Sequence, residues 1–493
     1  MSADITRREF LGTASAGMIA AATMGRLANG AMAGVGAGAN LPSFGRVRVL
    51  RVFMGPPRSG WPSPLIEAEA EVQRLKAQMA QAPGFDDVEF VGDELLVNPG
   101  AVLRLLEQHR DVAGVLAVQV AGGTTHTVCA LADSGFPTMM LAIPYSGHEW
   151  CIVPDLQKAG KKIDVLPSSD AKAVADAIRP LRAISRLRET RLLFVSGGWL
   201  PPEGFIPEVR ERLGVEIVPF DPARLSEAFD AVDAEAAEAD AKQWIGQAEV
   251  VKEPTREEIV KSARFSLALQ NVLAAEKAHV ITINCLGLFG QGKLPAYPCL
   301  GFARLNDLGY AGVCEADLAS ALTQIMYTHL AGVPGFVTDP VFDLSNGTLI
   351  HAHCVSATKM DGPAGPACPY AIRSHLEDNK GASLQVKMRI GQEITMAKLV
   401  SQDCRVAGKN PYLAATPAES LGASTLLVST GTIVEVPDVD RGCRTKVAVK
   451  VRDAQKMLDG WTHGLHRVIF YGNHMSDTRR LGRLLGLSVV EEG

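Results

Sequence analysis

The order of strand and helix patterns along the chain is the feature that most constrains its fold. Between residues 46 and 330, short apolar runs such as 115–120 and 279–285 alternate with segments that favour helices. Strands that alternate with helices are typical of βαβ units, in which neighbouring strands run parallel. We therefore expect parallel sheets covered by helices through the first two thirds of the chain.

The pattern changes after Pro334. Runs rich in β-branched residues follow, including 424–429 and 432–436 as two separate strands, and Asn346-Gly347 is a strong turn dipeptide within a hairpin over 342–353. A charged run at 186–189 separates the two α/β stretches. The predicted fold class is α/β, with two Rossmann-like doubly wound α/β domains and then a mostly antiparallel β-rich domain. The predicted boundaries are 45–188, 189–334 and 335–493.

The first 33 residues have the pattern of an export signal. Arg7-Arg8 precedes Phe10-Leu11, an apolar stretch covers 16–24, and Ala31-Met32-Ala33 offers a small-residue cleavage site. This order resembles a bacterial twin-arginine signal, and the alternative is a short helix with an accidental arginine pair. The apolar stretch is too short to span a bilayer, so we expect no membrane anchoring. We predict a signal peptide over 1–33, a leader over 34–44, and a periplasmic or other extracytoplasmic location.

Composition narrows the class of partner. The chain is 47% hydrophobic and 21% charged with a net charge of −5, which indicates a globular protein and excludes a basic nucleic-acid footprint. A small neutral or weakly polar substrate fits this balance. Nine cysteines occur without a C-x-x-C zinc pattern. We interpret them as small buried thiols, with one disulfide left open.

Two segments place acids near strand ends. In 312–318, Glu315 lies before a predicted helix and is expected to point into a cleft, whereas Asp317 is either functional or a helix cap. In 336–340, Asp339 ends a β-branched run, so we expect it at the carboxyl end of a strand, where parallel sheets form binding sites. The alternative for Asp339 is an Asp-Pro turn, and Asp343 is a competing acid in the hairpin.

Three histidines lie within twelve residues near the end of the chain. His463 and His466 precede a predicted strand, and His474 follows it. Either this group contributes to a site, or all three are structural.

Short motifs along the second half of the chain are shared with a known family. They are Asn284-Cys285, Pro298-Cys299, Leu305-Asn306-Asp307, Cys314-Glu315-Ala316-Asp317, Ala321-Leu322-Thr323, 381–384, 391–395 and the closing run 466–472. In these motifs the chain resembles the L-fucose/L-arabinose isomerase family. The likeness covers nearly all of the mature chain, with fewer specific residues in the first 280.

The resemblance implies a metal site and a reaction. It places the family's metal-binding residues on Glu315, Asp339 and His466, with Mn²⁺ or Mg²⁺ as the cofactor, and assigns proton transfer to the two carboxylates. Two carboxylates and an imidazole suit such a cation, which can act as Lewis acid and template in aldose–ketose isomerisation through an ene-diol. Arg467 departs from the small residue or histidine often found beside the metal-binding histidine, and we expect it to alter the pocket wall.

Weaker candidates for substrate contact follow from the same resemblance. His126 lies in a loop that related enzymes offer to a neighbouring subunit, which implies a homo-oligomer with sites between subunits. His353 either lines the pocket or has only a structural role within the β domain. His474 is a further candidate. The resemblance therefore predicts a metal-dependent isomerase acting on a free sugar. The alternatives are a non-catalytic exported sugar-binding protein of the same fold and a related metal-dependent sugar epimerase or lyase.

Overall fold

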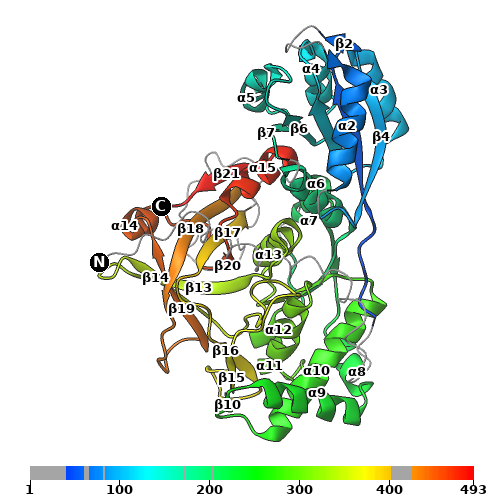
Figure 1. The fold of residues 1–493 in the computed structure, drawn as a ribbon. Coiled ribbons are helices and arrows are strands. Elements are labelled where there is room, and N and C mark those ends of the chain that lie inside the picture. The colour runs from blue at the N-terminus through cyan, green and yellow to red at the C-terminus, as the bar shows by residue number, and fades with distance from the viewer. Residues whose placement is uncertain (1–39, 60–65, 82–83, 171–172, 202–203, 401–424) are drawn as a thin grey trace, which may run out of the picture.

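The computed structural model describes residues 40–59, 66–81, 84–170, 173–201, 204–400 and 425–493. The predicted signal peptide, most of the predicted leader and Cys404 lie outside the described residues. The described chain is a mixed α/β molecule with two parallel sheets and one large antiparallel sheet. In Figure 1 the first parallel sheet is at the top, the second lies below it with its helices, and the antiparallel sheet is on the left.

The first sheet is parallel and has the strand order β4-β1-β5-β6-β7. Every residue of β5 and β6 is buried, which explains their almost continuous apolar sequences, because strands of a parallel sheet are covered on both faces. The elements of this region are β1 (Val47–Met54), β2 (Arg58–Ser59), β3 (Ile66–Glu67), α2 (Ala68–Ala80), β4 (Val88–Leu96), α3 (Pro99–Gln108), β5 (Gly114–Gln119), α4 (Thr125–Asp133), β6 (Thr138–Ala142), η2 (Glu149–Ile152), α5 (Val153–Lys158), β7 (Ile163–Pro167) and α6 (Ala173–Glu189).

The second sheet is also parallel, with the order β12-β11-β8-β9. Because all four strands run in one direction, their carboxyl ends share one edge of the sheet. The elements here are β8 (Arg191–Val195), α7 (Phe205–Leu213), β9 (Glu216–Pro219), α8 (Ala223–Asp230), α9 (Ala234–Gln247), β10 (Val250–Val251), α10 (Arg256–Ala275), β11 (Val280–Ile283), α11 (Cys285–Gly290), α12 (Cys299–Asp307), β12 (Ala311–Cys314) and α13 (Leu318–Ala331).

The C-terminal sheet has the order β17-β20-β13-β14-β19-β18-β21, and β17 also pairs with β18, so the sheet closes into a barrel-like form. All its pairs are antiparallel except β18 with β21. The elements are β13 (Phe336–Asp343), β14 (Thr348–His353), β15 (Tyr370–Arg373), β16 (Ser383–Val386), β17 (Glu393–Val400), β18 (Thr425–Glu435), β19 (Thr445–Val451), α14 (Ala454–Asp459), β20 (Arg467–Tyr471), α15 (Met475–Leu485) and β21 (Ser488–Glu491). Strands β15 and β16 form a small separate sheet with β10.

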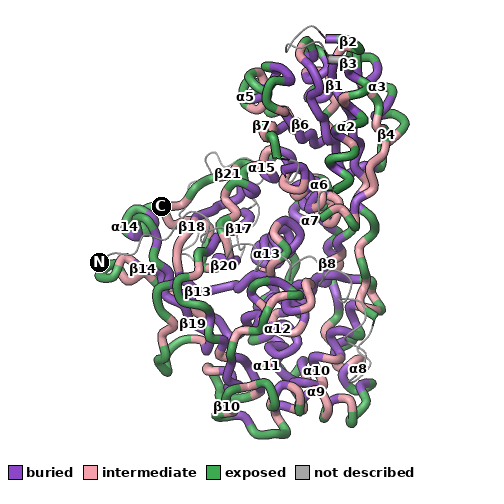
Figure 2. The backbone as a smooth tube through the Cα atoms, viewed as in Figure 1, coloured by how far each residue is buried: buried purple, intermediate pink, exposed green. Residues whose placement is uncertain are grey.

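Helix α13 lies at the centre of the molecule. Each of its residues from Leu318 to Leu330 is buried. It contacts β11 and β12 of the second sheet, β13, β17 and β20 of the C-terminal sheet, and α6. Figure 2 shows this helix as a buried element between the sheets. One hydrophobic core therefore joins all three regions of the chain.

The prediction of parallel sheets followed by an antiparallel region is confirmed at this level. The prediction of separate strands over 424–429 and 432–436 is wrong, because β18 is continuous through both. Gly431 pairs with Ile394 on one side and Val451 on the other, so strands on both sides hold the segment extended. Within the residues described, no helix combines the length and apolar character needed to cross a membrane.

The described end of the predicted leader lies against the body of the protein. Leu41 packs on the core of the second sheet, the Tyr310 hydroxyl donates to the Pro42 carbonyl at 2.8 Å, and the Phe44 ring stacks on His279. Residues 41–44 are therefore part of the packed structure.

Candidate metal centre

Glu315 is positioned by a strained turn between β12 and α13. Its φ is +66° and that of Ala316 is +54°, a left-handed conformation that non-glycine residues seldom adopt twice in succession. The turn is held because the Ala316 amide donates to the Ile283 carbonyl at 3.0 Å and Asp317 caps α13. Strain that the surrounding structure maintains is a recurrent property of functional sites.

The register of the C-terminal sheet gathers three more side chains. Thr338 of β13 pairs with Arg467 of β20, so the next residues along, Asp339 and His466, face each other. On the other side of β13, Asp339 pairs with Ala352, and His353, the last residue of β14, follows directly. Residues far apart in sequence thus meet because β13 lies between β20 and β14.

The side chains of Glu315, Asp339, His353 and His466 converge. His466 Nε2 lies 3.0 Å from Asp339 Oδ1 and 3.7 Å from Glu315 Oε2. His353 Nε2 lies 3.6 Å from Glu315 Oε1. One possible ligand atom from each of Glu315, His353 and His466 falls within 4.8 Å of the others. The structure therefore brings together the three predicted metal-binding residues and adds His353, while their roles stay a prediction.

Asp317 holds the His466 ring in place. Its Oδ2 lies 2.8 Å from His466 Nδ1, while its Oδ1 accepts from the Ser320 amide at 3.0 Å. A carboxylate on Nδ1 keeps the proton on that nitrogen and leaves Nε2 to face Asp339 and Glu315. Imidazole ligands of metals are commonly oriented in this way.

Electrostatics shift the protonation of this cluster. Burial lowers the pKa of His466, but the hydrogen bonds to Asp317 and Asp339 outweigh it and raise the pKa to about 10. Burial raises the pKa of Asp339, and His466 more than reverses this, so the pKa of Asp339 is lowered. The neighbouring His353 lowers the pKa of Glu315 in spite of burial. The pKa of Asp317 is lowered as well, so three carboxylates face the positive charges of His466 and the nearby Lys398, and the net negative charge that remains attracts a cation.

The donor set fits a divalent cation on structural grounds. Both ring nitrogens of His353 are buried without a hydrogen-bond partner among the described residues, and 3.6 Å is too long for a hydrogen bond to Glu315. A buried unpartnered imidazole costs free energy unless a ligand satisfies it. Carboxylate oxygens with imidazole nitrogens suit Mn²⁺ and related ions.

Two other predicted residues are not brought to the cluster. His474 precedes α15, and its Nε2 lies 2.7 Å from the Tyr471 carbonyl oxygen. It lies past the opposite end of β20 from His466, and a five-residue strand spans roughly 16 Å. His126 is exposed in the first turn of α4, in the region that contains the first parallel sheet. A hollow lined by Gly123, Thr125 and Glu149 lies near this turn.

The reasoning that led to Asp339 is wrong in one respect. Asp339 is in the middle of β13 and in an antiparallel sheet, not at the carboxyl end of a parallel strand. The following Pro340 is tolerated because β13 pairs with β20 only through Thr338, so no partner strand on that side needs a proline N–H. Glu315, in contrast, does follow the carboxyl end of a parallel strand.

Arg467 does not form a pocket wall, which corrects that expectation. Its side chain is fully buried, and its guanidinium binds both oxygens of Glu492 at 2.9 and 2.7 Å. It also donates to the carbonyls of Thr462 and His466. Arg467 therefore stabilises the loop that precedes His466 through these hydrogen bonds.

Sequence reasoning left the role of Asp317 open and missed Lys398. Asp317 was recognised as a helix cap or a functional acid, but its pairing with His466 depends on a contact across 149 residues. Burial raises the pKa of Asp317, but the hydrogen bond with His466 and the charge of Lys398 on β17 outweigh it, so the pKa of Asp317 is lowered. No sequence signal marked Lys398, since it occupies an ordinary position in a strand.

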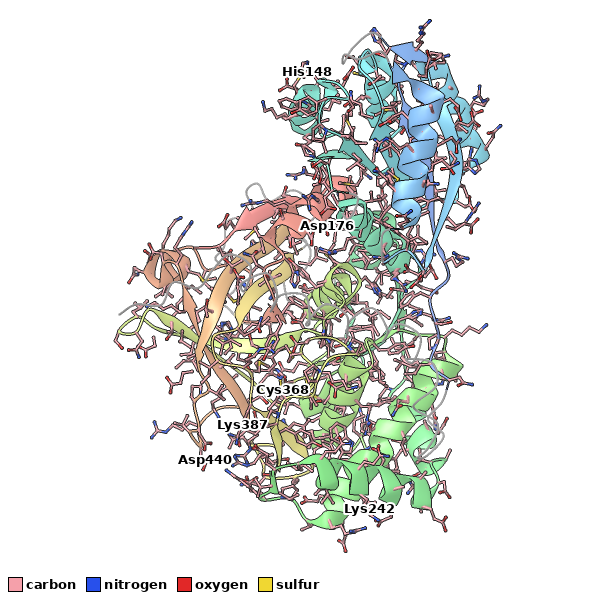
Figure 3. All side chains as sticks on the ribbon, in the orientation of Figure 1. His148, Asp176, Lys242, Cys368, Lys387 and Asp440 are labelled. Atoms are coloured by element: carbon pink, nitrogen blue, oxygen red, sulfur yellow. The ribbon has the colours of Figure 1, made fainter. Side chains whose placement is uncertain are left out.

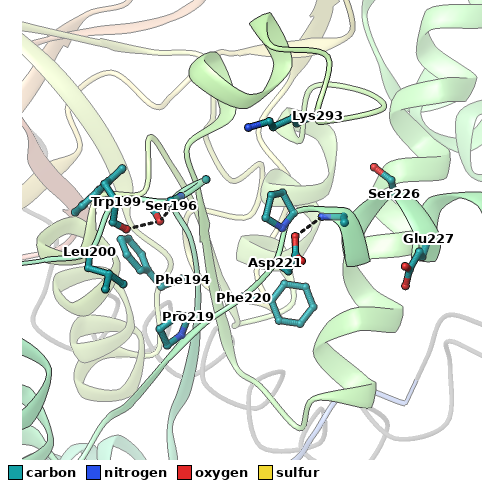
Figure 4. Close-up of a pocket in the computed structure, with 14 residues that line it drawn as sticks. Phe194, Ser196, Trp199, Leu200, Pro219, Phe220, Asp221, Ser226, Glu227 and Lys293 are labelled. Carbon is teal, nitrogen blue, oxygen red and sulfur yellow. Dashed lines mark hydrogen bonds between the residues drawn. The ribbon is translucent and has the colours of Figure 1, made fainter.

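A groove lies along the same sheet edge, at the carboxyl ends of β8 and β9. Its volume is about 940 Å³, and Figure 4 shows Phe194, Trp199 and Phe220 among its lining side chains. Its titratable members are Asp221, Glu227 and Lys293, and no histidine or cysteine is among the described residues that line it. The lining of the groove is mostly apolar and includes none of the residues of the carboxylate–histidine cluster.

The fold and the site together define a class: an α/β protein with a carboxylate–imidazole centre between a parallel and an antiparallel sheet. No family model matches the chain. The sulfoquinovose isomerase of Clostridium sp. (strain MSTE9) is 26% identical over 196 residues, or 38% of this chain and 39% of that protein. The chain thus aligns with well under half of that relative. Among solved structures, a chain of the XylFII-LytSN complex aligns over 50% of this chain and 85% of its own length. The two are 12% identical, and the TM-score is 0.13.

Proposed function

We propose that the protein is a metal-dependent sugar isomerase that interconverts an aldose and a ketose. The observation that carries the proposal is the convergence of Glu315, Asp339 and His466, with the unpartnered ring of His353 beside them. The partial similarity to a sulfoquinovose isomerase supports sugar isomerase activity in general. The strand order of the first sheet, 2-1-3-4-5 in chain sequence, supports a Rossmann-like doubly wound domain.

The residues divide the chemistry between them. Glu315, Asp339 and His466, with His353, would hold Mn²⁺ or Mg²⁺, which when bound supplies Lewis acidity to the adjacent oxygens of the sugar. One of the two carboxylates, Glu315 or Asp339, removes the proton from C2 of the aldose. The same proton returns to C1 while the hydroxyl proton passes from O2 to O1, which gives the ketose through an ene-diol. Asp317 keeps the His466 ring fixed throughout.

Location and assembly are part of the proposal. The twin-arginine pattern supports export of the folded protein to an extracytoplasmic compartment. His126 and the hollow near α4 would reach a centre of this kind only from another subunit, which supports a homo-oligomer with shared sites. The substrate is a free sugar, either neutral or carrying a sulfonate.

The test is an assay of the purified protein with a panel of neutral aldoses and with sulfoquinovose. Metal content is measured first, and ketose formation is followed with and without a chelator. We expect a bound divalent ion and turnover that the chelator abolishes and Mn²⁺ restores. A bound metal without isomerisation of any sugar would favour an epimerase or lyase, and a metal-free protein that still binds sugar would favour a binding protein.

Matched variants locate the chemistry. Asp339→Asn and Glu315→Gln should each lower kcat at least about 10³-fold, since each removes a metal ligand and a proton acceptor. Asp343→Asn is the control: the same change four residues along β13, at a carboxylate that binds only Ser345 and Asn346 in the hairpin turn. Full activity in Glu315→Gln with unchanged metal content would contradict the assignment.

A further inference from the structure

A second group of possible metal ligands lies immediately after His353. Cys354 Sγ, a ring nitrogen of His375 and a carboxylate oxygen of Glu377 all lie within 4.8 Å of one another. Cys443 joins them, since its Sγ lies 3.8 Å from Glu377 Oε1 and its thiol is hydrogen-bonded to that of Cys354. None of these residues belongs to the centre described above.

Strand pairing explains why the two sulfurs meet. Strands β14 and β19 pair antiparallel, and their last matched residues are His353 and Thr445. Cys354 follows β14 and Cys443 precedes β19, so both lie just beyond the end of this pairing. A pair of thiols at one end of a rigid ladder is held at short range by the backbone, not by the side chains alone.

The histidine comes from a loop that is itself fixed. The His375 ring stacks on Tyr297 with centroids 4.4 Å apart, and its amide and carbonyl bond to Lys380 and Asn379. Arg444 donates to the carbonyl of the preceding residue, Ser374, at 2.8 Å. The donor atoms of this loop are therefore preorganised.

The His375 ring has a buried nitrogen that makes no hydrogen bond among the described residues. The residue is 4% exposed, and Nδ1 makes no hydrogen bond of acceptable angle, although Glu377 Oε2 lies 2.7 Å away. A buried ring nitrogen and a carboxylate oxygen thus lie at ion-pair distance without a hydrogen bond between them, next to two sulfurs. This is the arrangement expected of groups that share a cation.

We propose that Cys354, Cys443, His375 and Glu377 form a second site, which takes a borderline-soft divalent cation of the zinc type. Two sulfurs, one imidazole and one carboxylate match the tetrahedral donor sets of Zn²⁺ and disfavour Mg²⁺ or Mn²⁺. The cation ties the loop after β15 to the adjoining ends of β14 and β19. The chain then carries an oxygen- and nitrogen-donor centre and a sulfur-donor centre on consecutive residues, His353 and Cys354.

Cobalt is the probe for this site, because Co²⁺ bound to thiolate shows a charge-transfer band that oxygen and nitrogen donors do not give. The full-length protein, reduced with a non-thiol reagent and stripped of metal, is titrated with Co²⁺ and, separately, with Zn²⁺. We expect the band to appear, Zn²⁺ to displace it, and Zn²⁺ to raise the Tm.

Variants decide which residues respond. Cys354→Ser and the partly exposed Cys443→Ser should each abolish the band and lower the Co²⁺ bound per chain by about one. Cys368→Ser is the matched control: Cys368, labelled in Figure 3, is also partly exposed, and its Sγ lies 4.0 Å from the Tyr471 hydroxyl oxygen instead. Glu315→Gln should keep the band, so failure of the proposed isomerase would leave this result unaffected. No band in the wild type, or a band that survives both serine variants, would overturn the proposal. So would ready formation of a Cys354–Cys443 disulfide in a protein that binds no Zn²⁺.

Discussion

At the scale of single residues, Asp317 serves two purposes with its two oxygens. Oδ1 caps α13 through the Ser320 amide, and Oδ2 bonds to Nδ1 of His466. A helix cap needs only an acceptor, which asparagine supplies as well as aspartate. Orientation and polarisation of an imidazole need the negative charge. The two functions can therefore be separated by a single substitution.

We predict that Asp317→Asn lowers metal affinity and kcat by about 10- to 100-fold with little change in stability. The measurements are metal titration, turnover and the Tm. The same substitution at Asp453, which caps α14 through the Lys456 amide, is the control and should leave both activity and metal binding unchanged. A loss of activity that excess Mn²⁺ fully restores would mean that Asp317 acts on metal affinity alone.

The sequence predicted part of this residue-level arrangement. Glu315, Asp339 and His466 were proposed from motif resemblance, and their types indicate what they can bind. The convergence of His353 with them was left open, because it depends on which strands pair. A one-residue change in the register of β13 against β20 would move Asp339 away from its position opposite His466 and turn its side chain to the other face of the sheet.

At the scale of elements, β20 is anchored by a buried ion pair. Arg467, fully buried, binds Glu492 in a bidentate manner and lies over the Trp461 ring at 3.9 Å. The pair fixes the residues after β21 to the start of β20 and to the loop that carries His466. An uncompensated charge would be left in the interior if either partner were removed.

Glu492→Gln should lower the free energy of unfolding by about 3–5 kcal/mol, since it leaves Arg467 without its counter-ion. Glu491→Gln, one residue earlier, removes an exposed pair with Arg479 and should cost no more than about 1 kcal/mol. Urea denaturation of both variants measures the difference. Equal losses would show that Arg467 finds other partners.

Element types were predicted better than element partners. The apolar runs over 115–120 and 279–285 fall on strands β5 and β11, within two residues at each end. The continuity of β18 through Gly431 was missed because a glycine between β-branched runs indicates a turn locally, whereas pairing on both sides decides the outcome. Local patterns specify periodicity, but sheet order is a long-range property.

At the scale of the whole molecule, two buried histidines connect residues 41–44 to the core. Phe44 stacks on His279 of the second sheet and meets His329 of α13 edge-on. Burial, reinforced by the charge of Arg186, lowers the pKa of His279 to about 4. Burial also lowers the pKa of His329 well below its usual value. Both side chains are therefore neutral in the folded protein at pH values where they are charged in the unfolded chain.

The sign of the pH dependence follows. The unfolded chain binds a proton at His279 near pH 6.5 and the folded protein only near pH 4, so stability is present above pH 6.5 and is lost as the pH falls through this window. We predict a loss of about 2 kcal/mol from His279 after allowance for solvent screening. His279→Gln should flatten the curve of unfolding free energy against pH, and the exposed His126→Gln should not. An unchanged slope in His279→Gln would contradict the assignment.

Helix α13 has a consequence for how the protein can be divided. Every side of the helix is covered. One part is covered by the second sheet and another by β13, β17 and β20, which are synthesised only after residue 335. A nascent or truncated chain that stops near residue 334 would expose an apolar face of α13, with its tyrosine and leucine side chains, to water. The three regions are therefore one cooperative unit. Fragments cut at the boundaries between these regions would aggregate instead of folding alone.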